Sequence, residues 1–164
     1  MITIRNLFLI LVSTAVILPL TGCGEKFPDG MPPPVPCEII VMQDGNPLEG
    51  AVVRLQPIGD SSWDAVGRTD ASGKAVVYTM DQYKGAVAGK YKVIVSKTET
   101  EESKGVVSSE EALGRDTSLA SFYLVEEQFG MASTTTLEIE AVKGTPTHTV
   151  DVGKAVRIKI DDRR

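Results

Sequence analysis

Short apolar runs separated by turn-forming residues recur from Cys37 almost to the end of this 164-residue chain. In the clearest run, residues 91–96, Tyr91, Val93 and Val95 would share one face of a strand. The other predicted strands are residues 37–43, 51–57, 63–69, 74–80, 137–141, 147–152 and 156–160. Seven or eight short strands at this spacing predict an all-β fold, an antiparallel β-sandwich of seven to eight strands.

The segment of residues 97–131 interrupts this rhythm. Residues 98–115 are rich in Glu, Ser, Thr and Gly, so we expect a solvated loop, in which Ser109 could cap a helical turn. Within residues 119–129, Phe122, Val125 and Phe129 recur at spacings of three and four. This spacing predicts one short helix that packs its apolar stripe onto the edge of the sheet.

The first 22 residues have the order of a secretory signal, with Arg5, an apolar stretch over residues 7–20 and then small residues. A membrane span needs about 20 apolar residues, and this stretch offers 14 with Pro19 inside. Its ending, Leu20-Thr21-Gly22-Cys23, resembles a bacterial lipobox, in which the cysteine is acylated and becomes the first mature residue. The resemblance implies that Cys23 carries lipid, palmitate among its acyl chains, and holds the protein on a membrane of the cell envelope. Gly24, where an aspartate would favour retention in the inner membrane, favours the outer membrane.

Residues 23–36 follow the signal and hold five prolines, at positions 28, 32, 33, 34 and 36. This composition predicts an extended, semi-rigid tether, which at about 3.1 Å per residue could hold a domain roughly 40 Å from the bilayer. A proline-rich recognition motif is the alternative. The expected organisation is a signal peptide over residues 1–22, the tether over 23–36 and the β-sandwich domain over 37–164.

Composition narrows the possible partners. The net charge of −5 becomes −6 when the signal peptide and its Arg5 are removed, and nucleic-acid binding would instead need clustered cations. If Cys23 carries lipid, Cys37 has no partner for a disulfide within the chain, and we expect it to be a small buried side chain. A reactive or intermolecular thiol is the alternative. The acidic residues Glu99, Glu101, Glu102, Glu110 and Glu111 would lie in a solvated loop, or else form a docking surface for a basic partner.

No catalytic, cofactor or metal site is predicted. His148 is the only histidine, which excludes a zinc site built on several histidines. It could pair with Cys37 as base and nucleophile, but the start of an apolar strand is a poor place for a reactive thiolate. Residues 70–73 could be part of a calcium loop, yet they lack the alternating oxygen donors and the distal Glu that such a loop needs.

Three motifs carry a resemblance to a known family. Residues 45–55 have the form Gly-x-Pro-Leu-x-Gly-Ala-x-Val-x-Leu, residues 69–75 the form Thr-Asp-x-x-Gly-x-apolar, and residues 89–95 the form Gly-x-Tyr-x-Val-x-Val. In this order they resemble the carboxypeptidase regulatory-like domain, a transthyretin-type (prealbumin-like) β-sandwich. The match is good over residues 37–97 and loose over residues 98–164, where residues 134–152 follow the closing strands of the family only in outline. The layout is also similar to small lipoproteins of planctomycete-like bacteria that carry one such domain.

The resemblance implies a module without an active site, because the family is named for an appendage of the enzyme. The expected function is therefore that of a lipid-anchored binding or scaffolding module, with an envelope protein or a glycan as partner. Glycan binding would use an exposed aromatic side chain, for which Trp63 is the best candidate for ligand contact. An accessory subunit of an export or surface-layer complex and an enzyme of unrecognised type are the alternatives.

Overall fold

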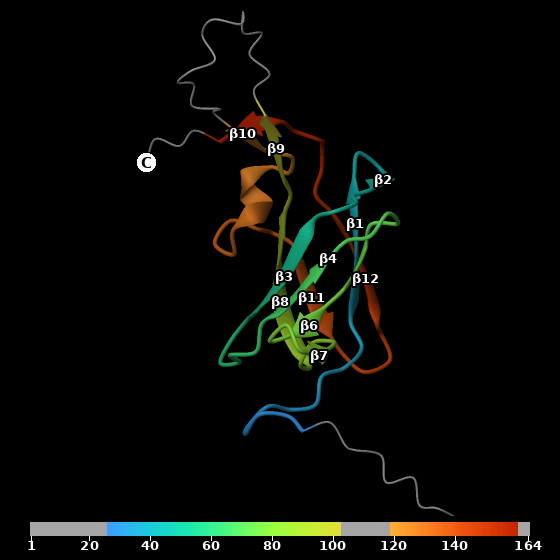
Figure 1. Ribbon diagram of the computed structural model, residues 1–164. Helices are drawn as coiled ribbons and strands as arrows, with labels where there is room; N and C mark the ends of the chain where they lie inside the picture. The colour runs from blue at the N-terminus through green and yellow to red at the C-terminus, as the bar shows by residue number, and fades with distance from the viewer. Residues whose placement is uncertain (1–25, 103–118, 161–164) are drawn as a thin grey trace, which may run out of the picture.

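Three sheets make up the computed structural model, which describes residues 26–102 and 119–160 (Figure 1). In the first sheet, β12 (Thr147–Asp151) pairs with β1 (Glu38–Gln43), whose other edge pairs with β2 (Asn46–Pro47) and β5 (Lys74–Val76). The second sheet has the order β11-β8-β3-β4-β6-β7, with the bounds Glu138–Ala141, Gly89–Ser96, Val52–Pro57, Ala65–Arg68, Tyr78–Thr79 and Tyr83–Lys84. The third sheet has the order β13-β10-β9, with the bounds Ile158–Lys159, Leu119–Tyr123 and Thr98–Glu102. The fold is all-β, as the sequence predicts.

Alternating apolar residues of the first two sheets form the core between them. β1 buries Ile39 and Val41, and β3 buries Val53 and Leu55. β8 contributes Tyr91, Val93 and Val95, all at most 1% exposed, which confirms the predicted inward face of this strand. The two sheets therefore pack as a β-sandwich.

One pairing departs from the antiparallel pattern. β1 and β12 run parallel, with Ile39 opposite His148 and Val41 opposite Val150. Parallel neighbours need a long connection, and here almost the whole domain lies between the two strands. A tight hairpin joins β1 to β2, where Asp44 and Gly45 both have positive φ (49° and 74°), as in a type I′ turn.

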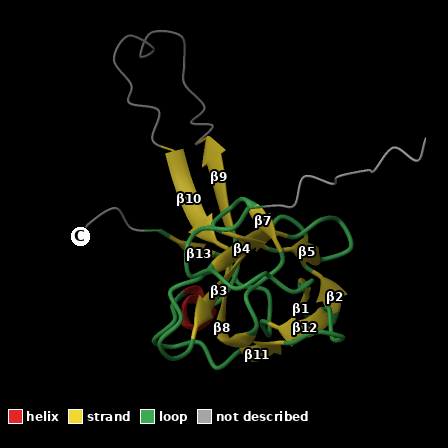
Figure 2. Ribbon diagram, turned by 90° about the horizontal axis from the view of Figure 1, so that it is seen from below, coloured by secondary structure: helices red, strands yellow, loops and turns green. Residues whose placement is uncertain are grey.

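The predictions for the region around residues 97–131 are wrong in two places. Residues 98–102 form β9 rather than a loop, and residues 119–123 form β10 rather than a helix, because the two segments pair antiparallel (Figure 2). A short 3-10 helix, η2 (Glu127–Gly130), follows further along the chain. Val125 and Phe129 are buried in the core as expected, from the bend after β10 and from η2. Phe122 is only half-buried on β10 and does not belong to this core, so the three residues do not form the predicted stripe. The predicted turn at Ser109 lies outside the described residues.

The N-terminal part of the described chain also differs from the expected spacer. Residues 26–36, which we call the docked segment, cross one end of the sandwich and pack against it (Figure 1). Val35 is the one residue of positions 32–36 that is not a proline, and so the one with a backbone N–H. It exchanges two backbone hydrogen bonds with Ala86, of 2.8 and 3.1 Å. The backbone of the docked segment is therefore paired with the domain at Val35.

Candidate functional site

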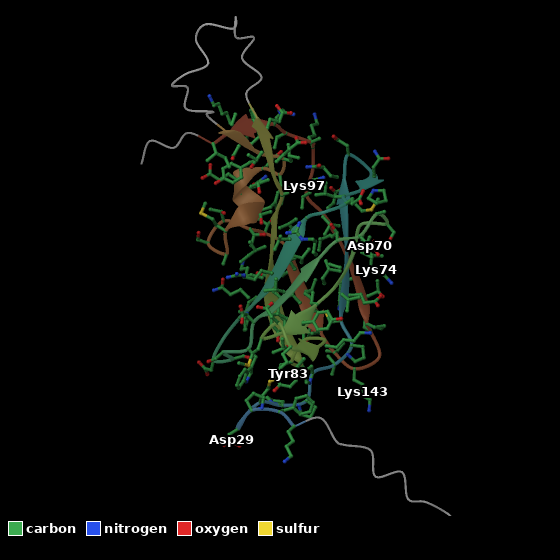
Figure 3. The ribbon with its side chains drawn as sticks, in the orientation of Figure 1. Asp29, Asp70, Lys74, Tyr83, Lys97 and Lys143 are labelled. Carbon is green, nitrogen blue, oxygen red and sulfur yellow. The ribbon has the colours of Figure 1, made fainter. Side chains whose placement is uncertain are left out.

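Cys23 and the predicted signal peptide over residues 1–22 lie outside the described residues, which begin at Lys26 with the docked segment. There, Met31, Tyr83 and Val87 form a small apolar cluster, separate from the main core, against which Phe27 and Trp63 pack. Tyr83 lies at the same end of the sandwich as Asp29 of the docked segment (Figure 3). The ring centroids of Phe27 and Tyr83 lie 5.3 Å apart, and the Tyr83 hydroxyl donates a hydrogen bond of 3.3 Å to the Lys26 carbonyl. These contacts hold the segment by side chains as well as by backbone.

Trp63, the candidate ligand contact, is therefore half-buried rather than an open platform. Its carbonyl accepts a hydrogen bond of 3.4 Å from the hydroxyl of Tyr91, which also donates to the Val87 carbonyl at 2.6 Å. Burial raises the pKa of Tyr91 to about 12, so this phenol stays a hydrogen-bond donor. An open polar hollow of about 470 Å³ lies along the adjoining loop, lined by Arg54, Gln56, Pro57, Gly59, Ser61, Ser62 and Asp64.

Cys37 is a free thiol that is only 2% exposed in the main core, beside the start of β1. Burial raises its pKa to about 11, and the neighbouring carboxylate of Glu38 acts in the same direction. The thiol is therefore protonated at neutral pH, which agrees with a structural side chain and not with a nucleophile. His148 lies on β12 opposite Ile39, and its buried Nε2 has no hydrogen-bond partner among the described residues.

We expect Cys37 to resist alkylation in the folded protein. The reactive species is the thiolate, and a rise in pKa from 9.0 to about 11 lowers the thiolate population at neutral pH about 100-fold. With Cys23 replaced by alanine, iodoacetamide should label Cys37 at least that much more slowly than an exposed cysteine placed at Ser62, and the two rates should converge in denaturant. Equal labelling rates in the folded protein would contradict the burial of Cys37.

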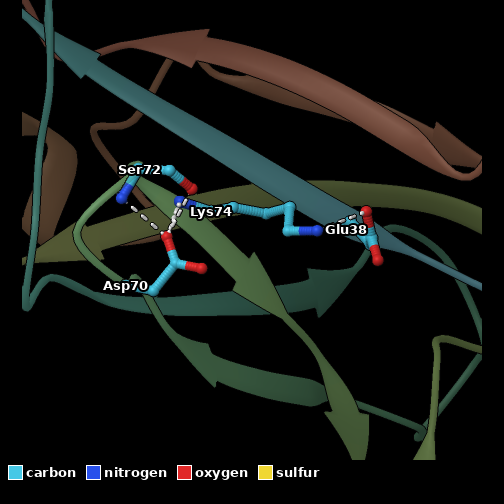
Figure 4. A network of polar contacts seen from close by, with 4 residues as sticks. All are labelled: Glu38, Asp70, Ser72 and Lys74. Carbon is cyan, nitrogen blue, oxygen red and sulfur yellow. Dashed lines mark hydrogen bonds and ion pairs between the residues drawn. The ribbon is translucent and has the colours of Figure 1, made fainter.

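Residues 70–73, the candidate part of a calcium loop, form a turn built around the carboxylate of Asp70 (Figure 4). Its Oδ1 accepts hydrogen bonds from the Ser72 hydroxyl (2.6 Å), the Ser72 N–H (2.8 Å) and the Lys74 N–H (3.1 Å). These bonds, that from the Ser72 hydroxyl above all, lower the pKa of Asp70. The Lys74 ammonium pairs with Glu38 at 3.5 Å and so links β5 to β1. The carboxylate shapes a turn, and within residues 26–102 and 119–160 no three or more His, Cys, Asp or Glu side chains gather as a metal site would require.

The third sheet lies at the end of the sandwich opposite the docked segment (Figure 1). On it, the Arg157 guanidinium lies 4.2 Å from the ring centroid of Phe122 and pairs with Glu99 at 3.4 Å and Glu101 at 2.6 Å. The hydrogen bond with Glu101 raises the pKa of Arg157. Two members of the predicted acidic cluster are thus ion-paired on a strand, while Glu110 and Glu111 lie outside the described residues.

Comparison of the chain with protein-family models, curated proteins and solved structures returns no significant match. Over the residues that the structure describes, no helix is long and apolar enough to cross a membrane.

Proposed function

We propose that this protein is a lipid-anchored component of the bacterial cell envelope, attached through Cys23, whose β-sandwich is a non-catalytic binding or scaffolding module. The observation that carries the proposal is the tetrapeptide Leu20-Thr21-Gly22-Cys23, placed directly after a short apolar stretch that begins near the N-terminus. An acyl chain contributes about 0.8 kcal/mol per buried methylene, and stable anchoring takes more than one chain. The two or three acyl chains of a bacterial lipoprotein would provide stable anchoring. Gly24, the residue after Cys23, favours placement in the outer membrane.

The chemistry of the described side chains supports a module without catalysis. The one free thiol in the described residues has a pKa of about 11, and the Asp70 carboxylate is engaged in holding its own turn. The buried thiol and the Asp70 carboxylate therefore have structural roles in this proposal. The resemblance of residues 37–97 to carboxypeptidase regulatory-like domains points the same way.

An envelope protein suits this surface better than a glycan as the partner. Trp63, the best aromatic candidate for sugar stacking, packs against Met31, Tyr83 and Val87. The third sheet instead presents exposed Tyr123 and Ile158, 40% and 47% exposed, beside the ion pairs of Arg157. Exposed aromatic and apolar side chains with a polar surround are common at protein interfaces. A role as accessory subunit of a larger envelope complex would use the same surface.

The proposed lipid attachment is tested by labelling growing cells with an alkyne-bearing fatty acid. The wild-type protein and the Cys37→Ala variant should both incorporate the label, whereas Cys23→Ala should not. Cys37→Ala is the matched control because it removes the other cysteine, which is buried in the core. Label on the Cys23→Ala protein, or none on the wild type, would contradict the proposal.

A further inference from the structure

The docked segment changes how far the sandwich can stand from a membrane. Phe27 contacts Tyr83, the Lys26 carbonyl accepts a hydrogen bond from the Tyr83 hydroxyl, and Val35 pairs with Ala86. Met31, also in the docked segment, is only 6% exposed. From Lys26 onward the chain is therefore part of the folded domain and adds nothing to the length of a free tether.

Three residue steps remain between Cys23 and Lys26. Whatever path they take, a chain cannot extend beyond about 3.3–3.6 Å per residue, so they span at most about 11 Å. A lipid on Cys23 would therefore keep the end of the sandwich that carries Lys26 close to the headgroups. The roughly 40 Å spacer expected from the proline content is not available.

Exposed apolar side chains are found at this same end. Met80, 51% exposed, lies in the turn between β6 and β7, three residues before the Tyr83 that contacts the docked segment. Ile58, 42% exposed, donates its N–H to the Lys90 carbonyl at the start of β8, and Val142, 38% exposed, follows the Ala141 that pairs with Gly89. Such side chains suit the apolar part of a membrane interface, where burial of their surface is favourable.

We propose that this end of the sandwich, with the docked segment and the exposed Ile58, Met80 and Val142, is the face that lies on the lipid bilayer. The third sheet then points away from the membrane and is free for a partner. β8 and β9 run from one end to the other, from Gly89 to Glu102, and at about 3.3 Å per residue they separate the two ends by up to about 40 Å. The inference rests on the proposed lipid attachment at Cys23.

The test measures energy transfer from a donor dye on the lipidated protein to an acceptor dye on lipid headgroups of vesicles. The donor is placed at Met80→Cys on the proposed membrane face or at Ile158→Cys on the third sheet, both in the Cys37→Ala background so that one free thiol remains. Transfer should be severalfold stronger at position 80 than at position 158. Equal transfer at the two positions, or stronger transfer at position 158, would overturn the inference.

Two further variants test the docking itself. A Gly/Ser insert of about 20 residues between Glu25 and Lys26 adds a mean reach of about 25 Å, and it should lower transfer at position 80 severalfold. Gly85→Ala should also lower it, because a Cβ at Gly85 would meet the backbone carbonyl of Val35 in the docked segment. Gly144→Ala is the matched control, since Gly144 has a similar φ (+97° against +105°) and its added Cβ would meet no atom of the described residues within 4 Å.

The outcomes separate this inference from the proposed function. Mass spectrometry of the vesicle-bound protein shows first whether Cys23 carries lipid, and its absence would overturn the proposed function. If lipid is present but the insert and Gly85→Ala leave transfer at position 80 unchanged, the attachment stands and the proposed membrane face is overturned.

Discussion

Replacement of Val93 by aspartate should leave much of the protein unfolded. Val93 is fully buried on β8, opposite Leu55 of β3, and its carbonyl already accepts a hydrogen bond from the Thr135 hydroxyl. An ionised carboxylate without a partner is prohibitively unfavourable there, so the group must be protonated or the domain must open. We expect a loss of several kcal/mol, against a typical total stability of 5–15 kcal/mol.

Lys92→Gln is the matched control on the other face of the same strand. The Lys92 ammonium pairs with Glu138 at 2.9 Å and donates to the Thr135 carbonyl at 3.3 Å, but its side chain is 32% exposed. Loss of a half-exposed pair costs less than about 1 kcal/mol. Urea unfolding followed by circular dichroism gives both values. Equal losses in the two variants would mean that the alternation of residues 91–96 does not define a buried face.

Gly67→Ala should also be strongly destabilising, for a steric reason. Gly67 lies on β4 of the second sheet, where an added Cβ would lie 2.5 Å from the Val76 carbonyl oxygen and 3.3 Å from the Val77 Cα. Both contacts are with backbone around the end of β5, so no side-chain rotation relieves them. Overpacking of this kind costs typically 1–3 kcal/mol, which should lower the melting temperature by several degrees.

Gly130→Ala provides the comparison, because Gly130 is the last residue of η2 and has no positive φ. Within the part of the chain that the structure describes, no atom lies within 4 Å of its added Cβ. Its melting temperature should stay close to that of the wild type in differential scanning calorimetry. If Gly67→Ala proved as stable as Gly130→Ala, the close approach of β4 and β5 would be incorrect.

The sandwich could be predicted because its strands carry a local signal. One buried face imposes a period of two on a strand, and the observed β8 covers the residues 91–96 where that period is cleanest. The turn at Asp44 and Gly45 was predictable for a similar reason, since its backbone needs residues that tolerate positive φ.

The region of residues 119–129 was not predictable from spacing alone. Phe122, Val125 and Phe129 fit a helical period, but residues 119–123 gain their hydrogen bonds from β9, which is distant in sequence and was expected to be a loop. Which segment a strand pairs with is not encoded in the spacing of its own apolar residues, so this pairing could not be predicted from either segment alone. Val125 and Phe129 were identified correctly as core residues, whereas Phe122 is half-buried on the third sheet, against the Arg157 guanidinium.

The packing of the docked segment against the sandwich was not predicted, because proline content indicates the conformation of the backbone and not the contacts of the side chains. Five prolines do favour an extended chain, and the chain remains without regular secondary structure over most of residues 26–36. The composition did not reveal that Phe27, Met31 and Val35 among these prolines would find partners on the domain. The apolar residues interspersed among the prolines were the one feature of the sequence that indicated this packing. Cys37, in contrast, was correctly expected to be buried, since it opens an apolar run.

The most direct test of the lipid-anchored account is the location of the Cys23→Ala protein in fractionated cells. Wild-type protein should remain in the membrane pellet after washes with high salt and carbonate and should enter the detergent phase on extraction. Cys23→Ala protein should leave the pellet or accumulate as a precursor, because residues 7–20 are too short to span the bilayer stably. Recovery of processed Cys23→Ala protein in the washed pellet at the wild-type level would contradict the account.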